Sequence, residues 1–161
     1  MAPVVERSSL RAMPSRREAF QALASDDAAI SADACDVLIE AYAALGGICD
    51  GDHLAERMRV LHGQPLSMLA RLIVQRELIT VERRGSIVVP LFQLDGSTWL
   101  PRPAVRRVVR ELRDVYNDLE LAWWFVQANP LLAGRSPVVE IEFTPEAVLD
   151  AARAEHFIAR W

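Results

Sequence analysis

The amino-acid sequence predicts a mainly α-helical fold, and three observations support this prediction. Apolar residues recur at spacings of three and four along several segments, which is the helical period. Serine, threonine, aspartate or proline stands just before most of these segments, as at helix starts. Strand-like runs, by contrast, are few and short. With 161 residues, 52% of them hydrophobic and 25% charged, the chain has the composition of a globular protein.

The N-terminal part of the chain predicts a flexible segment followed by three helices. Residues 1–30 open with Pro, Ser and Arg in no periodic order, and we expect this segment to be flexible. The three helices are expected at residues 32–45, 51–61 and 65–77. Their limits are marked by Gly46-Gly47, by the capping residue Asp50 and by Pro65.

A β-hairpin is predicted next. The runs Leu78–Glu82 and Ser86–Leu91 have strand-like composition, and Arg83-Arg84-Gly85 joins them as a turn. Helix, turn, helix and hairpin in this order form the outline of a winged helix-turn-helix. We therefore expect residues 31–95 to form a winged helix-turn-helix-like module.

Such a module suggests DNA binding, because its second helix enters a DNA groove while the hairpin contacts phosphate. Residues 46–113 hold 11 Arg against 7 Asp and Glu, although the whole chain carries a net charge of -4. The candidate DNA contacts are four arginines of the third helix and the hairpin, namely Arg71, Arg76, Arg83 and Arg84. The alternative is that they are ordinary surface charges.

Residues 96–161 predict a second, smaller helical domain. One helix follows Pro101 and Pro103 and has a valine-rich apolar stripe, and its arginine-rich face is expected to be mostly solvated. The next, Leu119–Ala128, is apolar nearly all round and should be the buried centre of this half. Residues 138–143 are expected to be extended. Thr144-Pro145 then starts the last helix.

The sequence contains none of the motifs that would indicate an enzyme. There is no nucleophile elbow and no phosphate-binding glycine loop. Cys35, Cys49, His53 and His62 lack the paired spacings of a zinc site, so we expect no metal, no cofactor and no catalytic residue. No signal peptide or membrane span is apparent, which predicts a cytoplasmic protein without a membrane partner.

From Val89 to its end, the chain resembles the Xre/MbcA/ParS-like toxin-binding domain of antitoxins. The resemblance rests on Pro90-Leu91-Phe92-Gln93-Leu94-Asp95, on the valine-rich helix, on Leu121-Ala122-Trp123-Trp124-Phe125 with Asn129-Pro130-Leu131-Leu132, and on Ser136-Pro137-Val138. It implies a helical domain, here residues 96–161, that neutralises a RES-type toxin, an enzyme that consumes NAD. Such antitoxins often also bind their operator DNA and dimerise, so the resemblance implies a homodimer.

The predicted toxin contacts are Trp124, Arg160 and Trp161. Tryptophan and arginine are frequent interface hot spots, although chain ends often fray. Trp123 and Phe125 are expected in the core instead. The leading hypothesis is thus an antitoxin that also regulates its operon. A second is a DNA-binding transcriptional regulator whose C-terminal half only dimerises, and a third is an enzyme whose site no motif reveals.

Overall fold

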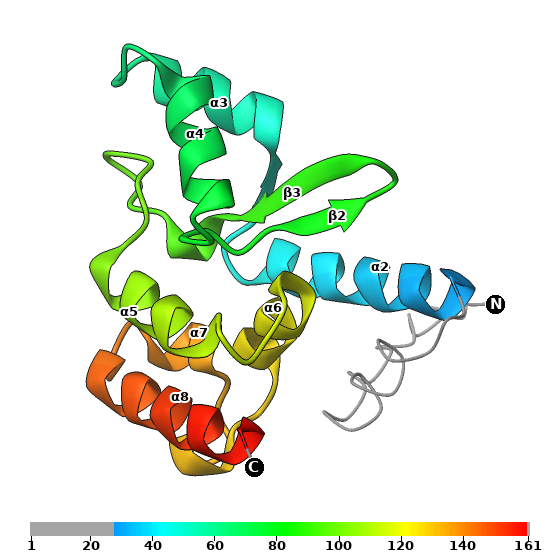
Figure 1. Cartoon of the computed structure of the whole chain (residues 1–161), viewed down its shortest axis with the longest axis vertical. Helices are drawn as coiled ribbons and strands as arrows, with labels where there is room; N and C mark the ends of the chain where they lie inside the picture. The colour runs from blue at the N-terminus through cyan, green and yellow to red at the C-terminus, as the bar shows by residue number, and fades with distance from the viewer. Residues whose placement is uncertain (1–27, 161) are drawn as a thin grey trace, which may run out of the picture.

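The computed structural model describes residues 28–160 (Figure 1). The fold is mainly helical and contains one small three-stranded sheet. Its first described helix, α2 (Ala28–Ala44), confirms the predicted first helix and begins one turn earlier. The helix ends where Gly46 and Gly47 adopt φ angles of 120° and 95°, which favour glycine. The predicted flexible segment, residues 1–30, lies almost wholly outside the described residues.

Two short helices follow and pack against each other: α3 (Gly51–Arg59) and α4 (Pro65–Val74). Asp50 caps α3, since its carboxylate accepts a hydrogen bond from the backbone N–H of His53 at 2.9 Å. Pro65 lies in the first turn of α4, where a helix needs no N–H donor. Both predicted helix starts are confirmed.

The sheet consists of β1 (Ile48–Asp50), β2 (Val81–Arg83) and β3 (Ser86–Pro90) in the antiparallel order β1-β3-β2. The β2–β3 hairpin confirms the prediction, and Arg84 and Gly85 in its turn have positive φ angles. Strand β1 was not predicted. It has only three residues, too few to show an alternating pattern, and it is defined by pairing with β3 far along the chain.

After β3 the described chain is helical. Its elements are the 3-10 turn η1 (Leu91–Gln93), α5 (Pro103–Leu112), α6 (Asp118–Val126), the 3-10 turn η2 (Pro130–Leu132), α7 (Pro137–Glu140) and α8 (Pro145–Ala159). The predicted helices of this half are confirmed. None of the helices among residues 28–160 combines the length and hydropathy needed to cross a bilayer.

The extended run predicted at residues 138–143 is wrong, because Pro137 begins the helix α7 there. Val138 and Ile141, three residues apart, are buried together, whereas Val139 is 39% exposed. Valine and isoleucine fill buried helical turns as well as strands, so a short run of them does not distinguish the two. The proline after Ser136 was the better signal, since it favours the first turn of a helix.

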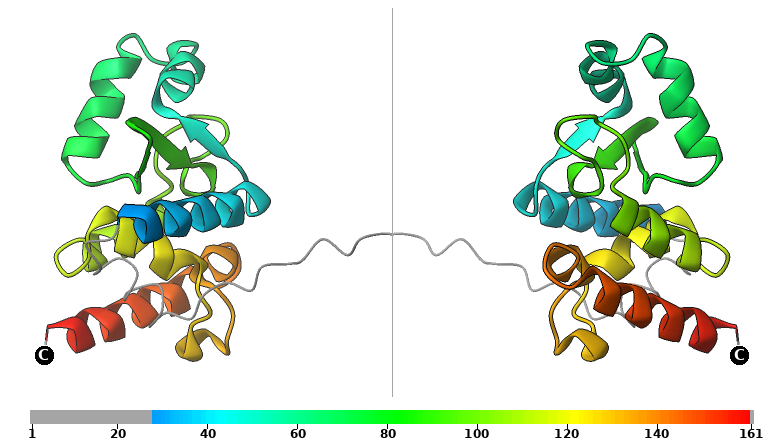
Figure 2. Two further views of the ribbon diagram at one scale, coloured as in Figure 1. Left: turned by 90° about the vertical axis from the view of Figure 1, so that its right-hand side faces the viewer. Right: turned by 90° about the vertical axis from the view of Figure 1, so that its left-hand side faces the viewer.

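Two hydrophobic clusters hold the fold together. The smaller one packs α3 and α4 on the sheet through Leu54, Met58, Leu69, Leu72 and Val89. The larger one centres on α6, whose Trp123 and Phe125 are fully buried, and gathers α2, α5, α7 and α8 around it. In Figures 1 and 2, α3 and α4 lie at one end of the molecule and α8 at the other, with α2 between them.

Helix α2 joins the two halves. Its Tyr42 hydroxyl donates a hydrogen bond of 2.7 Å to the backbone carbonyl of Ala122 in α6, and the Tyr42 ring stacks on Phe92 with centroids 5.5 Å apart. Leu38, which is also on α2, is fully buried in the larger cluster. The core of the C-terminal half therefore includes a helix that precedes the predicted boundary at residue 95.

Candidate functional site

Two of the four candidate DNA contacts are exposed. Arg71 lies on the outer side of α4, and Arg84 lies in the turn of the β2–β3 hairpin with a φ angle of 51°. No ion pair is found for either among the described residues. Helix and hairpin thus present two exposed cations without a described ion-pair partner, and their contact with DNA stays a prediction.

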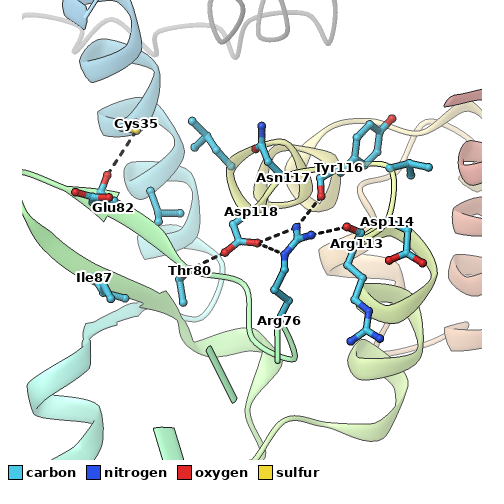
Figure 3. A pocket seen from close by; sticks show the side chains of 13 residues that line it. Cys35, Arg76, Thr80, Glu82, Ile87, Arg113, Asp114, Tyr116, Asn117 and Asp118 are labelled. Carbon is cyan, nitrogen blue, oxygen red and sulfur yellow. Dashed lines mark hydrogen bonds and ion pairs between the residues drawn. The ribbon is translucent and has the colours of Figure 1, made fainter. Parts of the chain in front are cut away.

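The expectation that Arg76 faces DNA is wrong. Its guanidinium points into a cleft and donates hydrogen bonds to the Asp118 carboxylate at 3.0 Å, to the Tyr116 carbonyl at 2.7 Å and to the Arg113 carbonyl (Figure 3). Thr80 donates a further hydrogen bond to Asp118. Arg76 therefore ties the end of α4 to the loop between α5 and α6, a connection that local sequence does not reveal.

Arg83 is half-buried and paired. Its Nε lies 2.8 Å from the carboxylate of Asp36 on α2, and both side chains are about 40% exposed. The Asp36 carboxylate offsets the charge of Arg83, which weakens its attraction for a phosphate. Of the predicted DNA residues, Arg71 and Arg84 are therefore the ones that are exposed and without a described ion pair.

The arginines of α5 pair with acids that lie on other elements. Arg106 and Arg110 of α5 both donate to Glu77, at 2.7 Å each, and these hydrogen bonds lower the pKa of Glu77 below its ordinary value. Arg107 pairs with Glu146 at the start of α8. The arginine face of α5 thus pairs with acids of other elements while Arg107 and Arg110 stay about half exposed, so the face is partly solvated, as expected.

Several large apolar side chains are exposed on α4 and just after α3, and the sequence did not lead us to expect them. Leu66 and Val74 on α4 are 65% and 81% exposed, and Val60 after α3 is 86% exposed. The signal was a second apolar stripe on α4, Leu66, Ala70 and Val74, at spacings of four beside the buried one. Base edges are read mainly by hydrogen-bonding side chains, so this face suits protein contact better than DNA.

The expected exposure of Trp124 is also wrong. Its side chain is 3% exposed and meets the ring of Phe125 edge-on, with centroids 5.2 Å apart. The six residues of α6 from Leu121 to Val126 are all buried in the larger cluster, so Trp124 has no exposed side. Arg160, by contrast, is exposed directly after α8. Trp161 lies outside the described residues.

The cleft around Arg76 has a volume of about 840 Å³ and lies between α2, β2 and the loop that leads into α6. Figure 3 shows Cys35 on one side, Asp118 above Arg76 and Arg113 on the other side. Burial raises the pKa of the Cys35 thiol, which keeps the thiol protonated and makes it a poor nucleophile. The Arg76 side chain is already used by its internal partners. The cleft thus has a structural network but no assembled catalytic group.

Metal-ligating residues do not cluster within residues 28–160, since no three His, Cys, Asp or Glu side chains lie together where they could hold an ion. Cys35 and Cys49 are free thiols. No protein-family model matches the chain, and neither the curated proteins nor the solved structures include one that is similar to it.

Proposed function

We propose that this protein is an antitoxin without catalytic activity, which neutralises a RES-type, NAD-consuming toxin through its C-terminal helical half. The proposal starts from the resemblance of residues 89–161 to antitoxin toxin-binding domains. The observation that carries it is the end of α8, which is held firmly by the core and then projects beyond it.

Helix α8 is fixed to the loop after α5 and to α5 itself near its C-terminal end. The Tyr116 hydroxyl donates a hydrogen bond to the buried Glu155 carboxylate. Nδ1 of His156 lies 2.7 Å from the Glu111 carbonyl oxygen and 3.1 Å from its carboxylate. One turn further, Ile158 is 68% exposed and Arg160 is exposed. A rigid helix end that carries an apolar and a cationic side chain loses little entropy on binding.

The charge of this end also suits the proposed partner. NAD⁺ carries a positive nicotinamide ring next to a negative pyrophosphate, so the part of the pocket that takes the ring would accommodate a cation beside an apolar side chain. Arg160 and Ile158 together offer that combination. The end of α8 is therefore proposed to occupy the NAD pocket of the toxin.

The direct test is co-expression with a RES-type toxin from the same genome. We expect the two proteins to purify as a complex, and we expect cellular NAD to stay near the level of cells without toxin. The control is the same toxin expressed alone, which should deplete NAD. A toxin that remains fully active and does not co-purify would show that the antitoxin proposal is wrong.

A second candidate function is DNA binding. It is favoured by the order of helix, helix and hairpin, which supports a winged helix-turn-helix arrangement, and by the exposed cations Arg71 and Arg84. The apolar outer face of α4 and the internal pairing of Arg76 and Arg83 weigh against extensive contact.

If DNA is bound, the double variant Arg71→Ala and Arg84→Ala should weaken binding to upstream DNA. Each lost phosphate contact lowers the slope of log affinity against log salt by about one, so the slope should fall by at most about two. Electrophoretic mobility shifts over a salt series measure this. Arg153→Ala, on the distant and exposed side of α8, is the matched control. If the double variant and the Arg153→Ala control have equal salt slopes, Arg71 and Arg84 make no phosphate contact, and α4 and the hairpin do not form a DNA interface.

A further inference from the structure

Strand β2 forms one edge of the sheet, and it lines the cleft of about 840 Å³ described above. The β2–β3 hairpin has a two-residue turn that places Arg83 opposite Ser86, so Arg83 and Val81 direct their backbone groups toward β3. The backbone groups of Glu82, which lies between them, point away from β3. The Cys35 thiol on α2 accordingly lies 3.9 Å from the Glu82 carbonyl oxygen. The Glu82 N–H therefore faces the cleft.

The open edge extends to the residue before β2. Thr80 lines the same cleft, and no backbone hydrogen bond is described for its N–H or for its carbonyl oxygen. None is described for the Glu82 N–H beyond the strand pairing either. A sheet edge with open backbone groups is a template for another extended segment, which can pair with it as a further strand.

The side of the cleft toward α2 and α6 is apolar. The Val81 side chain is buried in the larger hydrophobic cluster. The partly buried side chains of Cys35, Val115 and Leu119 pack against that cluster and also line the cleft. Glu82, the next residue of β2, points to the opposite face of the sheet and is exposed. A strand added to this edge therefore meets an apolar surface on one face and a carboxylate on the other.

The charges of the cleft favour a basic occupant. Arg76 is paired with Asp118 at 3.0 Å. This leaves one further cation, Arg113, against two carboxylates, Glu82 and Asp114, for which no ion pair is described. The balance of these remaining charges is negative, so an arginine on the added strand opposite Glu82 is attracted to it.

We infer that residues 7–13 of this same chain, Arg-Ser-Ser-Leu-Arg-Ala-Met, add to the open edge of β2 as a fourth strand of the sheet. The segment contains no proline and no acidic residue. Because side chains alternate along a strand, Leu10 lies on one face and Arg7 and Arg11 lie on the other. Leu10 then packs on the apolar side of the cleft, and Arg11 lies opposite Glu82.

The length of chain before α2 allows this contact. Fourteen residues separate Met13 from Ala28 at the start of α2, and they span up to roughly 45–50 Å when extended. Cys35 in the wall of the cleft lies only about 10 Å along α2 from Ala28. A segment tethered at this distance has an effective concentration of roughly millimolar, so a short strand with few hydrogen bonds can bind. The inference concerns the chain alone and does not depend on the proposed function.

Amide hydrogen exchange of the full-length protein, followed by NMR at the Glu82 N–H, tests the inference. Exchange should be about tenfold or more slower in the unmodified chain than in Leu10→Pro, because proline disrupts strand pairing. Arg11→Glu should also speed exchange, since it places like charges opposite each other. Arg17→Glu, the same charge change outside the segment, is the matched control and should leave exchange unchanged. Circular dichroism verifies that each variant is folded.

A charge-swapped variant tests the pairing of the two side chains. Arg11→Glu combined with Glu82→Arg should restore slow exchange at position 82, whereas Glu82→Arg alone should not. Equal exchange at Glu82 in the unmodified chain and in Leu10→Pro would overturn the inference. Slow exchange that appears only as the protein concentration rises would also overturn it, since the added strand would then come from another molecule.

Discussion

Truncation of the chain after Phe157 should strongly weaken neutralisation of the toxin and leave the fold intact. The buried residues of α8 all precede the cut, the last being Glu155, so the hydrophobic core loses nothing. The cut removes Ile158 and Arg160, which the structure exposes, together with Trp161. Losing one or two hot-spot residues costs roughly 2–4 kcal/mol of binding, which weakens the complex roughly 30- to 1,000-fold.

NAD consumption by the purified toxin, titrated with full-length and truncated protein, measures this effect, and thermal unfolding of the truncated chain verifies its fold. The point variant Arg160→Glu tests the contribution of the Arg160 charge apart from that of the other removed residues. It should also weaken inhibition. Arg153→Glu, an exposed arginine two turns earlier on the same helix, is the control. A truncated chain that inhibits as well as the full chain would place the toxin contact away from the end of α8.

The largest effect on stability is expected from Gln93→Leu. The Gln93 side chain is fully buried, and it accepts a hydrogen bond from the Ile79 N–H at 2.7 Å. Its amide nitrogen donates to the Ile79 carbonyl at 2.8 Å and to the Pro90 carbonyl at 2.9 Å. Leucine has a similar volume but would leave three backbone groups unpaired in the interior. Each such group costs about 1–3 kcal/mol, so the free energy of unfolding should fall by about 3–9 kcal/mol.

Urea unfolding followed by circular dichroism measures this loss, because the midpoint should move well below that of the unmodified chain. Gln75→Leu is the control, since Gln75 is exposed just after α4 and its side chain has no described hydrogen bond. Equal midpoints for the two variants would show that Gln93 does not hold the segment before β2 against η1.

The elements that the sequence predicted well are those with local signals. Asp50, Pro65 and Pro103 mark helix starts through chemistry confined to one turn, and Arg84-Gly85 marks a turn through its backbone preferences. Strand β1 and the position of α2 depend on partners far along the chain, so no local pattern predicts them. The error at α7 arose because valine and isoleucine suit both structures.

The candidate site was harder to predict because the partners of its side chains lie far along the chain. Arg71, Arg76 and Arg84 look alike in the sequence, yet only Arg76 lies within reach of Asp118, 42 positions away. The partners of Arg107 and Arg110 could likewise be sought only among near neighbours such as Glu111 and Asp114, whereas they are Glu146 and Glu77. Trp124 could not be placed because an all-apolar helix shows no exposed side.

The contact between Tyr42 and Ala122 has a consequence for synthesis of the protein. The two residues are 80 positions apart. Because chains grow at about 5–20 residues per second, α6 is synthesised roughly 4–16 s after α2. During that time Leu38, Ile39 and Tyr42, all buried in the finished fold, lack the helices that cover them. Until α6 is made, these side chains are therefore exposed on the nascent chain, and α2 cannot take its final place in the core.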